Sequence, residues 1–126
     1  MRSSEAGGDR GAVTAEAAMA IPVLAVFALA LVWALMVSSA QIRCVDAARA
    51  GARAAARSEP EARVREAALS AAPDRARIEV ERAGALWRVR VAAPTPGPGP
   101  LTLTLNAEAA AAAEDEFMED GAGVEP

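Results

Sequence analysis

The chain has 126 residues, of which 53% are hydrophobic and 3% aromatic, and its formal net charge is −4. This length leaves room for one small domain at most, and so few aromatic side chains argue against a wide ligand cavity. Because the sequence has no His, no Lys and a single Cys, the commonest catalytic bases, nucleophiles and zinc ligands are missing. We therefore expect no enzymatic activity, no metal, no cofactor and no small-molecule substrate.

The first feature in chain order is a short polar segment, residues 1–11, that precedes a long apolar run. Residues 17–42 carry no charge over 26 positions and are framed by Glu16 and Arg43. At 1.5 Å per residue this run measures about 39 Å as a helix, enough to cross a hydrocarbon core of about 30 Å with some tilt. Backbone groups in lipid must be satisfied within the segment, so we predict a transmembrane helix over residues 12–42.

Pro22 lies inside this predicted helix and removes one backbone donor, so a kink is expected there unless the helix starts near it. Two alternatives to a transmembrane helix are open for the apolar run. It could be the buried helix of a soluble protein, or it could be the apolar region of a secretory signal that is cut after Ala40. Its length and continuity argue against the first, and signal sequences have apolar regions of only about 7 to 15 residues.

A glycine and a glutamate stand at the start of the apolar run. Gly11 has no side chain, so the backbone can approach another molecule closely at this position. Glu16 at the border of the apolar run is costly in hydrocarbon unless it is paired, which makes it a functional candidate. An ordinary solvated carboxylate near a helix N-terminus is the simpler alternative.

The segment after the apolar run, residues 43–57, is rich in Ala and Arg and reads as a continuation of the same helix. Three arginines recur at four-residue spacing and form a basic stripe, and small residues at the same spacing form a seam that permits close helix approach. The stripe consists of Arg49, Arg53 and Arg57, and the seam of Ala47, Gly51 and Ala55. We expect this segment either to pack against other helices in a filament or to present a solvated face near lipid headgroups. We expect no nucleic-acid binding, because no aromatic residues are interleaved with the arginines.

These features together resemble the TadE-like family, whose members are minor pilins or pseudopilins of tight-adherence (Tad/Flp) type IV pilus systems. The C-terminal hairpin and the acidic tail further along the chain look like those of its actinobacterial members. Residues 10–57 carry the resemblance: Gly11 followed by Glu16, Pro22 six residues later, and the Ala/Arg run. One departure is Ala17, because members often have an aromatic residue after the glutamate.

The resemblance implies that residues 1–11 are a leader and that a prepilin peptidase cuts between Gly11 and Ala12. Glu16 would then stand fifth in the mature chain, where the matching glutamate of prepilins pairs with the N-terminal amine of a neighbouring subunit. The implied partners are membrane lipid, the peptidase, other pilin or pseudopilin subunits and the pilus assembly machinery. The implied location is the cell membrane, crossed once, with the N-terminus cytoplasmic and the C-terminal domain outside.

Residues 58–113 are expected to form a small cap. Ser58 is a candidate N-cap for a second helix that ends at Pro73. Two alternating segments follow and predict a hairpin with one of two registers. We favour the register with a turn at Gly84-Ala85, because it places glycine first in a type II′ turn and sets Glu79 opposite Arg90, with Glu81 opposite Arg88.

A Pro- and Gly-rich linker, residues 94–100, separates the hairpin from a third strand that begins at Leu101. Its continuation, residues 107–113, is mainly alanine and is either the end of the strand or a helix, and propensity favours the helix. The acidic residues 114–126 are expected to be disordered. The predicted fold is therefore α+β: a long N-terminal transmembrane helix, like a pilin stalk, followed by a cap of one helix and a three-stranded antiparallel sheet.

The distribution of arginines conflicts with the orientation that the resemblance implies. Four arginines follow the span within fifteen residues, whereas only Arg2 and Arg10 precede it. A positive-inside count would therefore put the cap in the cytoplasm. We favour the pilin orientation, since several independent segments match the family. A plain single-pass protein with a lipid- or partner-binding arginine helix, and a secreted protein that begins at Gln41, are the two rival functions.

Overall fold

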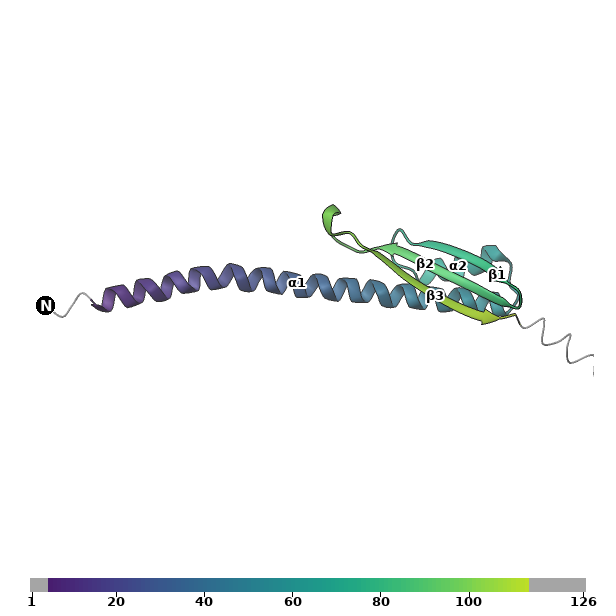
Figure 1. The fold of residues 1–126 in the computed structure, drawn as a ribbon, viewed down its shortest axis with the longest axis horizontal. Helices are drawn as coiled ribbons and strands as arrows, with labels where there is room; N and C mark the ends of the chain where they lie inside the picture. The colour runs from purple at the N-terminus through teal and green to yellow at the C-terminus, as the bar shows by residue number, and fades with distance from the viewer. Residues whose placement is uncertain (1–4, 114–126) are drawn as a thin grey trace, which may run out of the picture. The chain divides into compact units, whose positions relative to one another are not determined.

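The computed structural model describes residues 5–113, so the predicted disorder of residues 114–126 lies outside the described part. The elements are α1 (Glu5–Ala56), α2 (Glu61–Ala71), β1 (Arg77–Ala83), β2 (Leu86–Pro94), the short 3-10 helix η1 (Gly99–Leu101) and β3 (Thr104–Ala112) (Figure 1). A long N-terminal helix, one further helix and a three-stranded antiparallel sheet confirm the predicted α+β fold. The chain divides into two compact units, Met1–Leu35 and Met36–Pro126.

The first unit consists of the N-terminal part of α1. This helix begins at Glu5, within the polar segment of residues 1–11, and runs through Pro22 without a break. The alternative in which the helix starts near Pro22 is therefore wrong. No proline precedes Pro22, so the chain before it can continue the helix toward the N-terminus.

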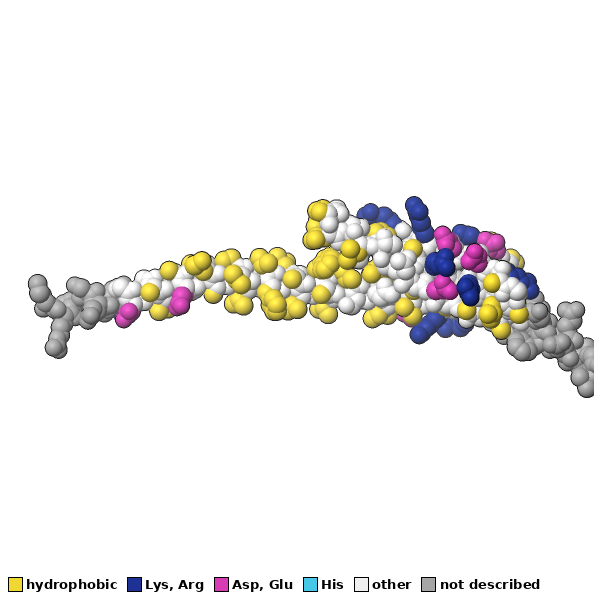
Figure 2. Space-filling view, in the orientation of Figure 1, with side chains coloured by type: hydrophobic (Ala, Val, Ile, Leu, Met, Phe, Trp, Pro, Cys, Tyr) yellow, Lys and Arg dark blue, Asp and Glu magenta, His cyan; other side chains and the backbone are white. Residues whose placement is uncertain are grey.

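The side chains of this first unit face outward on all sides of the helix. Met19, Leu24 and Phe27 are 75%, 64% and 61% exposed, and the other large apolar residues up to Leu35 are exposed as well, except Trp33, which is partly buried. Figure 2 shows this surface as an almost continuous band of hydrophobic side chains. A helix that is apolar all round is stable only when lipid or other protein covers it.

The second half of α1 ends in a left-handed turn. Ser58 has φ 55°, its amide donates to the carbonyl of Ala55 at 3.0 Å, and the amide of Glu59 donates to the carbonyl of Ala54 at 3.3 Å. These two bonds form the Schellman motif that commonly closes helices. Ser58 therefore terminates α1. The predicted N-cap role is wrong, because the residue at the N-cap of α2 is Pro60, which makes no side-chain cap bond.

The sheet is a meander with β2 in the centre. In the first pair Glu79 lies opposite Arg90, Glu81 lies opposite Arg88, and Gly84 has φ +63° in a two-residue loop. The favoured hairpin register is thus confirmed. It is the register that allows one face of the hairpin to be apolar while opposite charges meet on the other face.

The third strand differs from the sequence expectation. It begins at Thr104, three residues later than predicted, and it includes the alanine run that propensity assigned to helix. Residues 107–112 pair with Leu86–Val91 of β2, and alternate side chains turn toward the core. Helix propensity is outweighed here because β2 would otherwise carry a row of unpaired backbone groups, and because an alternating strand buries half of the alanines.

The core of the second unit lies between the sheet and the two helices. Val89 and Val91 from β2 are fully buried, as are Cys44 of α1 and Val64 of α2. Most of the helical contribution is alanine, which allows the helices and the sheet to approach closely. Arg65 of α2 donates to the carbonyl of Ile78 at 2.9 Å and joins the helix to the edge strand.

Ser58→Gly is expected to stabilise the second unit by about 1 kcal/mol, because glycine adopts the left-handed conformation without the cost that a Cβ imposes. The measurement is urea unfolding of the detergent-solubilised chain, followed by Trp87 emission in a Trp33→Phe background. The matched control is Ser70→Gly inside α2, which should lower stability by about 0.5 kcal/mol. A loss of stability in Ser58→Gly would contradict the left-handed termination of α1.

Candidate functional site

The candidate processing site lies on the first turns of α1. Gly11 and Ala12 are both exposed and helical. The hydroxyl of Thr14 donates to the carbonyl of Arg10 at 2.9 Å, so a local bond spans the peptide predicted to be cut. A Cβ added to Gly11 would meet no atom within 4 Å. Packing therefore does not require glycine at this position, so the presence of glycine here is compatible with a functional role.

Glu16 is exposed on the same helix, four residues after Ala12 and thus one turn away on the same side. Among the residues whose side chains the structure describes, none forms an ion pair with its carboxylate. From Ala17 onward the helix surface is uncharged as far as Ile42. The carboxylate of Glu16 lies at the border of this uncharged surface. It is available to a positive charge such as the amine that a cut before Ala12 would create.

The predicted small-residue seam is buried. Ala47 and Ala55 are 0% and 1% exposed, and Gly51 is buried between them. A Cβ on Gly51 would lie 2.8 Å from Cγ1 of Val89 and 3.2 Å from Cβ of Ala68. The seam does permit close approach, but what approaches is the chain's own sheet and α2. The expectation that these three residues pack against another subunit is therefore corrected: they pack within one subunit.

The basic stripe lies on the opposite, exposed side of α1. Arg49 and Arg53 are exposed, and among the described side chains neither pairs with an acid. Arg57 bonds to Glu59, with 2.6 Å between the guanidinium and the carboxylate. Exposed pairs of this kind contribute less than about 1 kcal/mol. Two of the three arginines are thus available to an external anion.

The outer face of the sheet carries a cluster that the sequence expectation captured only in part. Arg90 lies 3.5 Å from Glu79 on one neighbouring strand and 3.1 Å from Glu108 on the other. The hydrogen bond and the charge of Glu108 raise the pKa of Arg90. Glu79 was predicted from the hairpin register. Glu108 was missed because propensity favoured a helix for its segment and the strand alternative was left open. Continuing the alternating pattern through residues 105–111 would have placed Glu108 beside Arg90.

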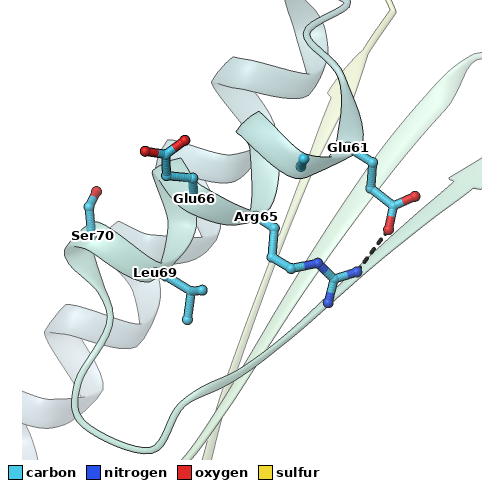
Figure 3. Close-up of a pocket in the computed structure, with 6 residues that line it drawn as sticks. Glu61, Arg65, Glu66, Leu69 and Ser70 are labelled. Carbon is cyan, nitrogen blue, oxygen red and sulfur yellow. Dashed lines mark hydrogen bonds and ion pairs between the residues drawn. The ribbon is translucent and has the colours of Figure 1, made fainter.

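A shallow depression lies along one side of α2 (Figure 3). Its lining residues all come from this one helix, and the guanidinium of Arg65 bonds to Glu61 at 2.8 Å across a single turn. This is a salt bridge four residues apart on a solvated helix. Nucleophile and base are not brought together there, and within residues 5–113 no group of His, Cys, Asp or Glu side chains is placed to hold a metal.

Gly51→Leu is expected to destabilise the second unit by about 3 kcal/mol, because a large side chain must displace Val89 from a packed core. Urea unfolding measured through Trp87 emission gives the free energy. Arg53→Leu adds the same side chain on the exposed side of the same helix and should change stability by less than about 0.5 kcal/mol. Equal stability of the two variants would mean that the seam does not face the chain's own sheet.

One helix in the described part of the chain is long and apolar enough to cross a membrane. It covers Gly8–Ala56, with a mean hydropathy of 2.7 in its most apolar window and none of that window buried. No curated protein and no solved structure matches the chain. Residues 11–53 match the family model described as TadE-like protein.

The matched segment begins at the glycine of the candidate processing site and includes Glu16, Pro22, Arg49, Gly51 and the whole apolar run. Residues 54–113, which supply the remainder of the cap, lie beyond it. A family associated with the Tad pilus and a helix of this kind together indicate a membrane protein associated with that pilus. The resemblance inferred from the sequence is confirmed, and the chain is TadE-like over residues 11–53.

Proposed function

We propose that this chain is a minor pilin or pseudopilin of a Tad-type type IV pilus. It is made as a precursor, cut by a prepilin peptidase between Gly11 and Ala12, and held in the membrane until it takes part in pilus assembly. The observation that carries this proposal is the family match, which starts at Gly11 and continues through an apolar helix that the chain itself leaves uncovered. Because the apolar segment of this helix is not part of the folded core, it can move from a lipid environment to one of neighbouring helices without any part of the chain unfolding.

Cleavage requires the first turns of α1 to open, because a peptidase binds its substrate in an extended form. Gly8 and Gly11 both lie in the helix, and each costs about 1 kcal/mol relative to alanine. Neither makes a contact that a Cβ would disturb. The glycines therefore lower the free energy of local unwinding around the cut, while the apolar part of the helix stays intact.

The new amine at Ala12 and the carboxylate of Glu16 form the assembly contact. On a continuous helix the two groups lie one turn apart, so Glu16 can neutralise its own amine while the subunit is in lipid. In a pilus the same carboxylate pairs with the amine of a neighbouring subunit. An unpaired charge in an apolar environment costs several kcal/mol, so the pair sets how far one helix slides along the next.

The cap lies outside the cell in this proposal, because the leader must face a cytoplasmic peptidase. The positive-inside count points the other way, since Arg43, Arg49, Arg53 and Arg57 follow the apolar run. Arg57 is paired with Glu59, which reduces the charge that opposes translocation. The rival is a plain membrane anchor with its cap in the cytoplasm, where the exposed Arg49 and Arg53 would bind anionic lipid or a partner.

The mass of the mature N-terminus tests the proposal directly. In cells that contain the peptidase, intact-protein mass spectrometry should give a chain that begins at Ala12. A chain that begins at Gln41 would identify a secreted protein, and retention of Met1 or Arg2 would identify the plain anchor. Gly11→Leu, expected to block the cut because a side chain obstructs entry into the peptidase site, is the matched control, since packing tolerates a side chain at this position.

Glu16→Gln should leave cleavage intact and impair assembly. The substitution removes the charge but keeps the shape, and loss of one partner of an ion pair in an apolar environment is expected to cost about 3 kcal/mol, or on the order of a hundredfold in incorporation. The readout is the ratio of this protein in sheared pili to that in membranes. Asp46→Asn changes an exposed acid of the same helix and should have no effect. Normal incorporation of the Glu16 variant would disprove the pairing.

A further inference from the structure

The connection between β2 and β3 differs in chemistry from the rest of the second unit. Residues 91–107 carry no charge, although Arg90 and Glu108 border them directly. Leu101 and Leu103 within the connection are 54% and 59% exposed. β1 begins opposite Ala92, whereas β2 and β3 remain paired as far as Pro94 and Thr104, so the connection extends beyond the sheet (Figure 1).

This connection has a defined conformation. Thr95 is 4% exposed, its amide donates to the carbonyl of Leu103 at 2.7 Å, and its hydroxyl accepts from the amide of Leu103 at 2.8 Å. At the tip, the amide of Leu101 donates to the carbonyl of Pro98 at 2.9 Å within η1. The two exposed leucines are therefore held at the surface by the fold, and their exposure is a property of the folded state.

The register within the second unit shows which end of the cap carries the connection. Gln41 of α1 donates to the carbonyl of Asn106 at 3.1 Å. Three residues later along β3, Ala109 is paired with Val89, which packs on Gly51. β3 and α1 thus run in the same sense. The residues before Asn106 consequently lie on the side of the cap where α1 continues into the last turns of its uncharged segment, before Gln41.

We propose that the β2–β3 connection is a second membrane-contact element, which inserts Leu101 and Leu103 into the interfacial region of the leaflet next to the cap. The proposal uses the membrane span of α1 and does not depend on the pilin function. On this side of the cap α1 still carries exposed apolar residues, since Met36 and Ile42 are 50% and 61% exposed. Figure 2 shows hydrophobic side chains at the tip of the connection, in contrast to the charged sheet.

The backbone of the connection suits a lipid interface. Four of the seven residues from 94 to 100 are proline, which has no amide hydrogen to satisfy. Unsatisfied backbone donors are the main obstacle to placing a loop at membrane depth, so the prolines and the bonds of Thr95 and Leu101 lower this cost. A soluble protein partner is the less suitable occupant, because the connection lies at the end of the cap from which α1 continues toward its apolar segment.

The test compares two positions on the full chain in nanodiscs of phosphatidylethanolamine and phosphatidylglycerol, with one protein per disc. In a Cys44→Ala background, Leu101→Cys is labelled with an environment-sensitive fluorophore, and spin-labelled lipid is the quencher. Ala85→Cys is the matched control, since Ala85 is an exposed turn residue at the far end of the hairpin. We expect a blue shift and a loss of emission at position 101 and neither at position 85.

Equal quenching at the two positions would overturn the proposal. A blue shift at position 101 without quenching by spin-labelled lipid would also overturn it, because the fluorophore would then lie against protein. The same label on Leu101→Cys in a Leu103→Asp background adds a second measurement. A charge beside the label should draw the connection toward water and reduce the quenching, whereas a label that partitions into lipid by itself would be quenched as before.

Discussion

The close contact between Gly51 and Val89 is the constraint on which the second unit depends. Because glycine has no side chain, the isopropyl group of a strand residue reaches the backbone of α1, and alanines on either side allow the sheet to lie flat against the helix. Most apolar side chains in this core are small, so packing must be close for burial to stabilise the cap. The same contact fixes how β3 runs along the helix and therefore where the β2–β3 connection lies.

α1 carries two kinds of surface along one continuous helix. Up to Leu35 its large apolar side chains, apart from the partly buried Trp33, are exposed in the described part of the chain, whereas from Ala40 onward small side chains turn toward the sheet. The first surface suits lipid or neighbouring helices, and the second suits a fixed partner within the subunit. In the proposed pilin function, this division would let the subunit leave the membrane without losing its fold, since assembly would replace only what surrounds the first surface.

The charges lie where they do not interfere with either surface. Arg90 bridges Glu79 and Glu108 on the solvent face of the sheet, and Arg49 and Arg53 point away from the core. The β2–β3 connection and the adjoining ends of both strands are uncharged over 17 residues, from Val91 to Ala107. Such a partition is expected for a domain that sits on a membrane, because a charge near hydrocarbon is costly and a charge in water is not.

The sequence by itself determined the helix of the apolar run, the hairpin register and the family, because each depends on local information: an uncharged run of 26 residues, a glycine between two alternating segments, and a short motif before a span. It also located the small seam of Ala47, Gly51 and Ala55. Only the tertiary structure decided that the seam faces the chain's own sheet and that the alanines after Ala107 form a strand. Small residues are compatible with any close neighbour and alanine favours a helix in isolation, so the outcome depends on which unpaired backbone and which apolar face the rest of the fold presents.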